Sequence, residues 1–457
     1  MNSFFYSAFE RLYYPYIIYA MNTGSIFRRL RSLKSHIGAS QEEGKVDRSH
    51  QKAVKHEDEE EEDDKFYDVI VVGGGITGSS SAYMLAKSGL KVLLLEQYDM
   101  CHTNASSHGD GRIIRYSYPE DIYIKLSKLA YPLWAQAEKE SQEKLIHITG
   151  GIDFGGYQEE ALKQLLIAYD NNKINYSILN YKEANKRFPQ FKFQKETLVV
   201  YQPDSGVVFA SKAVSTMWKL ARKYGATTLA NKRVDTITVD SESLVTVKTF
   251  DHSTYQAKKI VLACGGWIND VLLRSQLEVR VPVNVTQEKV FYFAPKPTTP
   301  PTIDHSMHSC PVSIYYAGES IFYTLPQIEV RGVKVGLHRS GPILESMDGA
   351  KKPYPEEHTK AVREFVHHYM PSLESEQEIS SLTCHYTSAL DFNFIIDRHP
   401  AHRNLIIVSP CSGHGFKFGP AIGQLVLDLA MDIEPPIPME EFSLSRFKHK
   451  LYKRIGA

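Results

Sequence analysis

Two arginines in the first third of the chain have the spacing of an anion-binding pair. Arg112 and Arg115 flank two apolar residues, so a short segment can present both guanidinium groups on one side. A guanidinium holds a carboxylate or a phosphate through two parallel hydrogen bonds. An isolated pair of this kind is also common on solvated surfaces, so the interpretation depends on what else the chain brings to these arginines.

A glycine-rich turn precedes the arginines. An apolar run leads into a helical pattern through the spaced glycines Gly73, Gly75 and Gly78. Gly73 permits the tight turn, Gly75 lets the backbone approach a phosphate, and Gly78 lets the helix pack on its strand. The next apolar strand ends at Glu96, about twenty residues later, where a ribose hydroxyl needs an acceptor. This context predicts a dinucleotide-binding turn rather than an ordinary strand-to-helix turn.

The same pattern returns near the end of the chain. The apolar run 405–408 leads into a glycine loop and then a helix, and the loop contains Gly413, Gly415 and Lys417. In a doubly wound sheet the carboxyl ends of parallel strands share one edge. The second loop can therefore face the same ligand as the first and bring a cation to it.

The elements that must position these residues follow from the hydrophobic pattern. Apolar runs predict strands at 69–72, 91–96 and 405–408, and another runs into glycines over 259–267. The pattern of 147–155 is typical of a sheet edge, and alternating residues over 279–341 indicate an antiparallel sheet. Helices are predicted at 79–88, 122–139 with a kink or break near Pro132, 158–171, 181–188, 207–224, 359–370 and 420–431.

Length and composition describe an ordinary soluble chain. Its 457 residues are 42% hydrophobic, which is enough for two or three domains. Lysine plus arginine and aspartate plus glutamate both total 53, so no overall charge favours nucleic acid. The five cysteines are widely spaced and form no CxxC pair, which fits a reducing compartment and no metal site.

Residues 1–65 do not resemble part of the fold. The aromatic stretch 4–20 is short for a membrane span and contains charges, which argues against insertion. Residues 21–40 are basic, rich in serine and free of acids, as in an organelle transit peptide or a disordered extension. The consecutive acids of Glu57 to Asp64 predict a solvated linker.

Four motifs, in order, resemble the monomeric sarcosine oxidase family of flavoenzymes, which also contains pipecolate, N-methyltryptophan and fructosyl-amino-acid oxidases. They are Asp68-Val-Ile-Val-Val-Gly-Gly-Gly75, Ser107-His-Gly-Asp-Gly-Arg-Ile-Ile-Arg115, Cys384-His-Tyr-Thr387 and Ser412-Gly-His-Gly-Phe-Lys417. The similarity extends from about residue 66 to 445. Together the motifs are far more specific than any glycine pattern alone.

The resemblance implies an FAD cofactor and roles for individual residues. It implies a thioether between Cys384 and the flavin, and an oxygen-activating cation at Lys334. It also implies that Arg115 and Lys417 hold a substrate carboxylate and that Glu96 binds the adenosine ribose. Tyr323 and His338 match residues of the family's substrate pocket, and Arg112 and His108 match residues near the flavin ring.

Three positions depart from the family pattern, and they concern the pocket more than the chemistry. His385 stands where methionine is common, Gly111 where threonine is common, and Pro410-Cys411 where a small, flexible pair is usual. The family's peroxisomal members end in a Ser-Lys-Leu type signal, whereas this chain ends Arg454-Ile-Gly-Ala457. We therefore expect an intracellular protein and leave the choice between mitochondrion and peroxisome open.

Pattern and resemblance together predict an α/β fold. A doubly wound, Rossmann-like FAD-binding domain is expected from 66–145, 205–275 and 388–445. An inserted antiparallel-sheet substrate domain is expected from 146–204 and 276–387.

The predicted protein is a monomeric FAD-dependent amine oxidase that binds no nucleic acid. It would oxidise a secondary or N-methyl amino acid, sarcosine-like or pipecolate-like, with oxygen as acceptor, to an imine and hydrogen peroxide. The alternatives are a flavin dehydrogenase with another acceptor and a flavin-binding protein without turnover.

Overall fold

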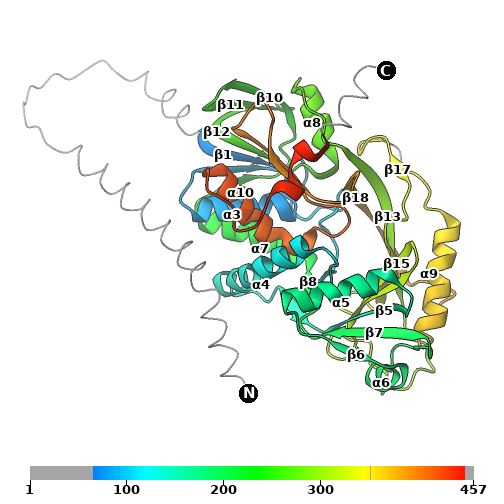
Figure 1. Ribbon diagram of the computed structural model, residues 1–457. Coiled ribbons are helices and arrows are strands. Elements are labelled where there is room, and N and C mark those ends of the chain that lie inside the picture. Colours follow the sequence, from blue (N-terminus) through cyan, green and yellow to red (C-terminus); the bar gives the residue numbers. More distant parts are fainter. Residues whose placement is uncertain (1–64, 350, 448–457) are drawn as a thin grey trace, which may run out of the picture.

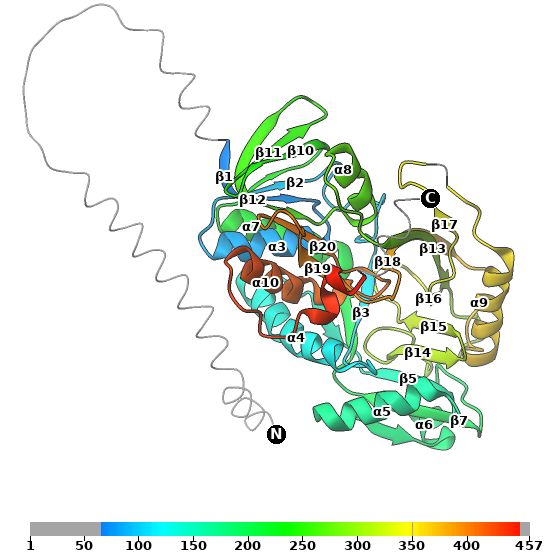
Figure 2. The same cartoon turned by 45° about the horizontal axis from the view of Figure 1, so that its top comes forward.

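The computed structural model describes residues 65–349 and 351–447, so the predictions for residues 1–64 and for the last ten residues lie outside it. Within this part, the strands form an eight-stranded, a nine-stranded and a three-stranded sheet (Figure 1). The two larger sheets build separate halves of the molecule, and the three-stranded sheet lies between them (Figure 2).

The eight-stranded sheet is the doubly wound unit. Its central strand, β1 (Phe66–Val72), pairs in parallel with β2 (Val92–Leu95) and with β12 (Thr254–Leu262). The strand order is β10-β11-β12-β1-β2-β9, and β20 joins β12 in parallel while β19 pairs with β20. The remaining strands are β9 (Thr227–Leu229), β10 (Val234–Ser241), β11 (Leu244–Thr249), β19 (Ile395–Arg398) and β20 (Leu405–Ser409).

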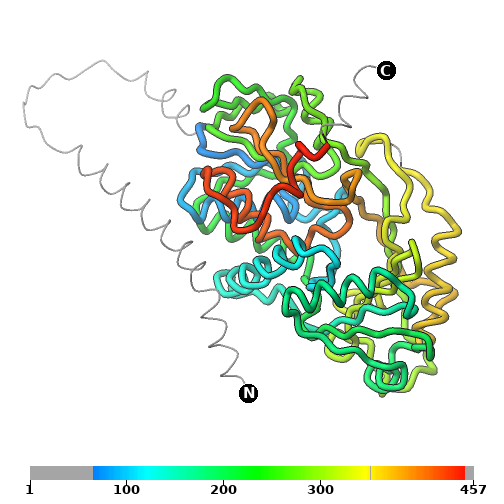
Figure 3. Tube along the Cα trace, viewed as in Figure 1, coloured from blue at the N-terminus to red at the C-terminus, as the bar shows by residue number. Residues whose placement is uncertain are grey.

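Both faces of this sheet are buried, which explains the apolar run Val69–Val72 of β1. Val69 and Val71 face a core made with four helices, whereas Ile70 and Val72 face a second core under β10, β11 and α8 (Ile268–Arg274). The four helices are α3 (Ile76–Lys87), α4 (Asp121–Ser141), α7 (Ala210–Lys223) and α10 (Gly419–Ala430). Figure 3 shows α3 and α10, from opposite ends of the described chain, side by side.

The nine-stranded sheet is mostly antiparallel and has the order β17-β13-β16-β15-β14-β5-β7-β6, with β18 paired to β13. Its strands are β5 (Gly151–Gly156), β6 (Ser177–Leu179), β7 (Thr197–Gln202), β13 (Val283–Phe293), β14 (Val312–Ala317), β15 (Ser320–Leu325), β16 (Val333–Leu337), β17 (Ile343–Leu344) and β18 (Ser380–Ala389). Helices α5 (Glu160–Asn172), α6 (Tyr181–Arg187) and α9 (Glu356–Tyr369) accompany it. The predicted fold class is thereby confirmed.

Three local predictions need correction. Residues 207–209 are not the start of a helix but belong to β8 (Gly206–Phe209), which pairs with β3 (Gly111–Ile114) and β4 (Ile146–Ile148). Helix α4 is not broken near Pro132, which lies inside it. The stretch 147–155 is an edge only in its first part, where β4 is the outer strand of the three-stranded sheet, because its second part, β5, lies between β14 and β7.

Four short 3₁₀ helices complete the described elements: η1 (Gly265–Trp267), η2 (Phe416–Phe418), η3 (Glu440–Phe442) and η4 (Leu444–Phe447). No helix in the described ranges has the length and apolar character needed to cross a membrane.

Candidate active site

A cavity of about 560 Å³ extends from the glycine loop to the nine-stranded sheet. Its walls include residues that follow the carboxyl ends of β1, β2, β12 and β20, the edge where doubly wound sheets bind ligands. All the predicted site residues except Gly78 line it, and they come from distant segments: Gly73, Gly75, Glu96, His108, Arg112, Arg115, Tyr323, Lys334, His338, Cys384, Gly413, Gly415 and Lys417.

The glycine loop has no room for side chains. Gly73 has a φ of 103°, and a Cβ there would lie 2.4 Å from the carbonyl oxygen of Ala263. A Cβ at Gly78 would lie 1.7 Å from the carbonyl oxygen of Gly73. Gly75, the N-cap of α3, and the next two residues line the cavity, so the positive end of the helix faces it. The N–H of Ile76 donates to the Ser107 hydroxyl at 3.2 Å. This geometry suits a pyrophosphate.

Glu96 is held at the same end of the cavity. One of its carboxylate oxygens accepts a hydrogen bond from the backbone N–H of Gly74 at 2.7 Å, and the other accepts one from Tyr98 at 3.0 Å. Trp218 donates to the carbonyl oxygen of Gly74 at 2.8 Å and so fixes the loop from the other side. The sequence pattern contained no sign of this tryptophan contact, because α7 reaches the loop only through tertiary packing.

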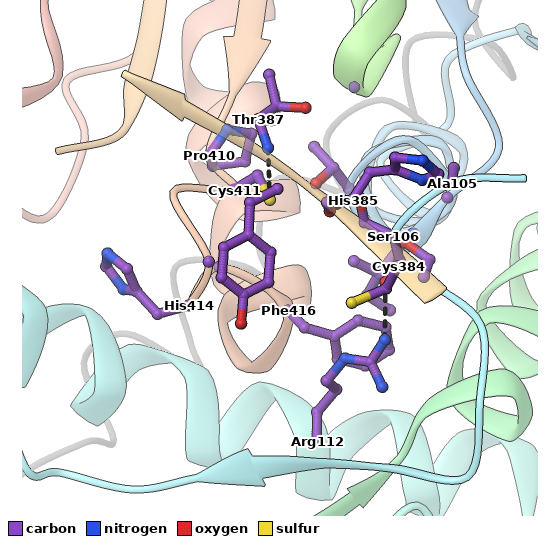
Figure 4. A pocket seen from close by; sticks show the side chains of 18 of the residues that line it. Ala105, Ser106, Arg112, Cys384, His385, Thr387, Pro410, Cys411, His414 and Phe416 are labelled. Carbon is purple, nitrogen blue, oxygen red and sulfur yellow. Dashed lines mark hydrogen bonds between the residues drawn. The ribbon is translucent and has the colours of Figure 1, made fainter. Parts of the chain in front are cut away.

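Cys384 lies on β18 at the opposite end, next to Arg112 (Figure 4). Burial raises the pKa of its thiol, while the charges of Arg112 and Lys334 act in the opposite direction. Three carbonyl groups hold the Arg112 guanidinium, those of Gly111 at 2.9 Å and of Ser106 and His108 at 2.8 Å each. The thiol therefore faces a fixed positive charge.

Lys334 is a buried cation beside the same thiol. Its ammonium group donates to the carbonyl oxygen of Gly111 at 3.0 Å and lies 3.6 Å from a carboxylate oxygen of Asp110. Burial, together with the charge of Arg112, lowers its pKa to about 8, and Asp110 opposes this shift. Lys334 is consequently charged at neutral pH and close to losing its proton.

Arg115 and Lys417 meet at a third wall of the cavity. Lys417 donates to the Tyr118 hydroxyl at 2.7 Å and to the carbonyl oxygen of His414 at 2.6 Å. The guanidinium of Arg115 lies over the Tyr118 ring, 4.7 Å from its centre, so both cations share one aromatic partner. Burial and then the charge of Arg115 bring the pKa of Lys417 well below its usual value.

Asp153 balances part of this charge, and the sequence pattern did not reveal it. Its carboxylate lies 3.7 Å from Arg115 and accepts hydrogen bonds from Ser117 at 2.7 Å and from Tyr316 at 3.1 Å. Burial alone would lower the pKa of Arg115, but neighbouring tyrosines and Asp153 leave it above its usual value. A lone aspartate within an apolar strand, as in β5, is the only sequence signal that could have found it.

Tyr323 lies on β15 and His338 directly follows the neighbouring strand β16, and both line the cavity. Burial and then the charges of nearby cations lower the pKa of His338 to about 3, so its imidazole is neutral at physiological pH. Gly413 has a φ of 81°, and a Cβ there would lie 2.7 Å from the His338 ring. A Cβ at Gly415 would lie 1.6 Å from the carbonyl oxygen of Pro410.

Several buried polar atoms in the cavity wall have no hydrogen-bond partner within the described part of the chain. They are His108 Nε2, His385 Nδ1, Thr387 Oγ1 and Ser409 Oγ. Buried polar groups are rarely left unpaired. A large polar ligand that reaches from the glycine loop to β18 would supply the missing partners, and a flavin dinucleotide has the required length and hydrogen-bonding groups.

Comparison with known proteins agrees with this geometry. The family model "FAD dependent oxidoreductase" matches residues 68–429. A monomeric sarcosine oxidase of Bacillus sp. (strain B-0618) is 32% identical over 377 residues, 81% of this chain and 93% of that protein. The peroxisomal sarcosine oxidase of Homo sapiens is 31% identical over 386 residues, 81% of this chain and 94% of that protein.

Solved structures show the same fold. The amino acid oxidase NikD, in its open form, superposes with a TM-score of 0.72 at 23% identity, over 83% of this chain and 97% of that one. The glycine loop, the acid that follows it and the unpaired polar atoms of the cavity all fit FAD. The chain belongs to the family of FAD-dependent oxidoreductases that contains the monomeric sarcosine oxidases.

Proposed function

We propose that the protein oxidises the C–N bond of a secondary or N-methyl amino acid to an imine, with oxygen as the final acceptor and hydrogen peroxide as product. Bound FAD supplies the two-electron chemistry. The observation that carries the proposal is that one cavity joins the glycine loop to Cys384 and to the paired cations Arg115 and Lys417. The relatives named sarcosine oxidase support the same substrate class.

Arg115 and Lys417 bind the carboxylate of the substrate in this proposal. Two buried cations around one tyrosine are costly unless an anion joins them, and Asp153 balances one charge only. Arg115 contributes a planar, two-pronged donor and Lys417 a point charge. Together they orient the amine for reaction, where small displacements cost rate heavily.

His338 receives the amine end of the substrate. Its imidazole is neutral because burial and the nearby cations lower its pKa to about 3. A neutral ring can accept a hydrogen bond from the amine without adding to the positive charge of the cavity. Tyr323, on the neighbouring strand, closes the wall beside it.

Cys384 and Lys334 serve the cofactor. Cys384 would hold the flavin through a thioether, in which an S–C bond replaces the thiol S–H and one C–H of a ring methyl group; the flavin would take up the two electrons, and oxygen, the proposed acceptor, would reoxidise it. Burial raises the pKa of the thiol, and the charges of Arg112 and Lys334 offset part of this effect. The Lys334 cation then stabilises the negative charge that develops as oxygen accepts an electron. Glu96 holds the adenosine ribose, as acids at this position do in dinucleotide sites.

We further propose a monomeric, intracellular enzyme, in the mitochondrion or the peroxisome, whose substrate-binding sheet is inserted into the FAD-binding domain. All five cysteines are free, which favours a reducing compartment. The substrate is a small molecule from solution.

The test is a peroxide assay on the purified yellow protein with N-methyl amino acids and their methyl esters. The wild-type protein should release peroxide when it oxidises an N-methyl amino acid, and it should oxidise the methyl ester of the same amino acid far more slowly. Arg115→Met should remove most of this preference, and Arg115→Lys should restore part of it, because a charge returns without the planar geometry. Equal turnover of ester and acid would contradict the carboxylate role.

The same experiment separates the other possible functions. Bleaching of the flavin by an amine, with slow recovery of colour in air, would indicate a dehydrogenase with another acceptor. A flavin that no secondary amine bleaches would indicate a binding protein without turnover.

A further inference from the structure

A third cation faces the substrate end of the cavity, and none of the roles above uses it. Arg339 directly follows His338 after the end of β16; it is exposed and lines the cavity. Its backbone is left-handed, with a φ of 57°. A residue other than glycine pays free energy for this conformation and keeps it where the surroundings hold it in place.

Phe392 and Ser412 hold Arg339. The guanidinium stacks on the Phe392 ring, 3.7 Å from its centre, and donates to the carbonyl oxygen of Ser412 at 3.4 Å. Phe392 is itself left-handed, with a φ of 62°, and 45% exposed. Two residues with unfavourable backbones therefore face each other at the cavity. Stacking fixes the plane of the guanidinium and leaves most of its N–H donors at its edge.

Within the described residues Arg115 has a carboxylate within ion-pair distance, whereas Lys417 and Arg339 have none. Asp153 lies 3.7 Å from Arg115, and Lys417 donates to Tyr118. Within the described residues no carboxylate forms an ion pair with Arg339. Burial lowers the pKa of Arg339, and the neighbouring Tyr386 and Tyr123, followed by the charge of the exposed Glu120, oppose this shift without reversing it. Arg339 thus keeps free N–H donors at the cavity after one carboxylate has bound to Arg115 and Lys417.

We propose that Arg339 binds a second anionic group of the substrate. This inference rests on the proposed function and narrows it: the substrate is an N-substituted amino acid with two carboxylates. Arg115 and Lys417 take the carboxylate next to the reacting C–N bond. Arg339 takes the second through two parallel hydrogen bonds, a geometry for which a stacked guanidinium is prepared.

The experiment compares diacids with amides of the same shape. The substrates are racemic N-methylaspartate and N-methylglutamate, each against its side-chain amide, N-methylasparagine or N-methylglutamine. The wild-type enzyme should show a kcat/KM about 10- to 100-fold higher for at least one diacid than for its amide, because a charge-assisted pair is lost in the amide. Arg339→Gln should bring this ratio close to one, and Arg339→Lys should leave it intermediate.

Arg187→Gln is the matched control. Arg187 is also exposed and stacks on an aromatic ring, 3.8 Å from the centre of Tyr201, but it does not line the cavity. The control should keep the wild-type ratio. A loss of the ratio in both variants would show a general effect of surface charge and overturn the assignment to Arg339.

A binding measurement gives a readout that does not depend on turnover. Succinate and succinamate can be titrated against the change they cause in the visible spectrum of the bound flavin. Tighter binding of succinate by at least tenfold, lost in Arg339→Gln, would support the proposal. Equal affinities, together with equal kcat/KM for acids and amides, would overturn it and leave the proposed function intact. No turnover of any N-methyl compound would overturn both.

Discussion

Replacing Lys334 with methionine should make the protein more stable at neutral pH and much slower to react with oxygen. Burial lowers the pKa of Lys334 from 10.5 to about 8. At 1.36 kcal/mol per pKa unit, holding the charged form costs the folded state about 3 kcal/mol. Methionine fills similar space without a charge but loses the hydrogen bond to the Gly111 carbonyl, worth about 1 kcal/mol. The expected net gain at pH 7 is about 2 kcal/mol.

Asp110, the ion-pair partner of Lys334, keeps its other hydrogen bonds when Lys334 is replaced by methionine. Its carboxylate still accepts hydrogen bonds from the Tyr292 hydroxyl at 2.9 Å and from the backbone N–H of Gly111 at 2.8 Å. The Gly111 carbonyl also retains the Arg112 side chain as a donor at 2.9 Å. Removing Lys334 therefore leaves no buried oxygen of this group without a partner.

The sign of the pH dependence follows from the lowered pKa. Because Lys334 binds its proton less tightly in the folded state, its neutral form is favoured by folding. This contribution is fully present above pH 10.5 and is lost as the pH falls through about 8. The stability advantage of Lys334→Met should thus be near its full size at pH 7 and small at pH 10, as measured by urea denaturation of both proteins with equal flavin content.

The reaction with oxygen should change in the opposite sense. Two opposite charges in contact, at about 4 Å, attract by about 4 kcal/mol at an effective dielectric constant of about 20, which is the upper limit for the contribution of Lys334. Its loss would slow reoxidation by at most about three orders of magnitude. In the wild-type protein, reoxidation should also slow as the pH rises through about 8, because Lys334 becomes neutral.

Stopped-flow measurements of the two half-reactions provide the test. Reduction by substrate should change little in Lys334→Met, whereas reoxidation in air-saturated buffer should become slow and lose its dependence on pH around 8. Lys289→Met is the control, since Lys289 lies on β13 but does not line the cavity. Equal slowing of both half-reactions, or a variant less stable than wild type at pH 7, would refute the reasoning.

Three further predictions concern the cofactor. Acid precipitation should carry the yellow colour down with the wild-type protein and leave it in the supernatant for Cys384→Ala; free flavin from wild type would contradict the thioether. Gly78→Ala should abolish FAD retention, because its Cβ would lie 1.7 Å from the Gly73 carbonyl oxygen, and a variant with full flavin content would show that the loop can adjust. A chain that begins at Asp64 should fold and bind FAD, since β1 begins at Phe66; insoluble, colourless protein would argue against this boundary.

The nucleotide end of the site could be predicted well from the sequence because its determinants are local. Gly73, Gly75 and Gly78 act within one turn, and β1 and α3 differ from the predicted ranges by only a few residues. The motif around Cys384 could be recognised because it resembles a known pattern, and the structure places Cys384 in the cavity wall, while its thioether stays a prediction. The neighbours that complete both sites, Trp218 at the glycine loop and Lys334 beside Cys384, come from distant segments.

The substrate end could not be predicted in the same way, because its contacts join distant strands. Asp153 reaches Arg115 only because β5 and β14 pair beside it, and nothing near Asp153 in the sequence indicates an arginine. The Arg339 guanidinium is held in place by stacking on Phe392, which lies on another loop. The short strand Gly206–Phe209 was mistaken for helix for the same reason, since its two partners are remote.

The pairing of β12 with both β11 and β20 has a consequence for how the chain is made. Thr254 to Ala257 can pair with β11, which has already been synthesised. Ile260 to Leu262 can pair with β20 only after β20 has been synthesised. The first residue of β20, Leu405, follows Leu262 by 143 residues. At a synthesis rate of about 5–20 residues per second, this apolar edge remains open for about 7–30 s on the ribosome. An unpaired apolar edge is a template for aggregation, so the nascent chain should depend on chaperones in that interval, and it should acquire FAD only after its last strand has emerged.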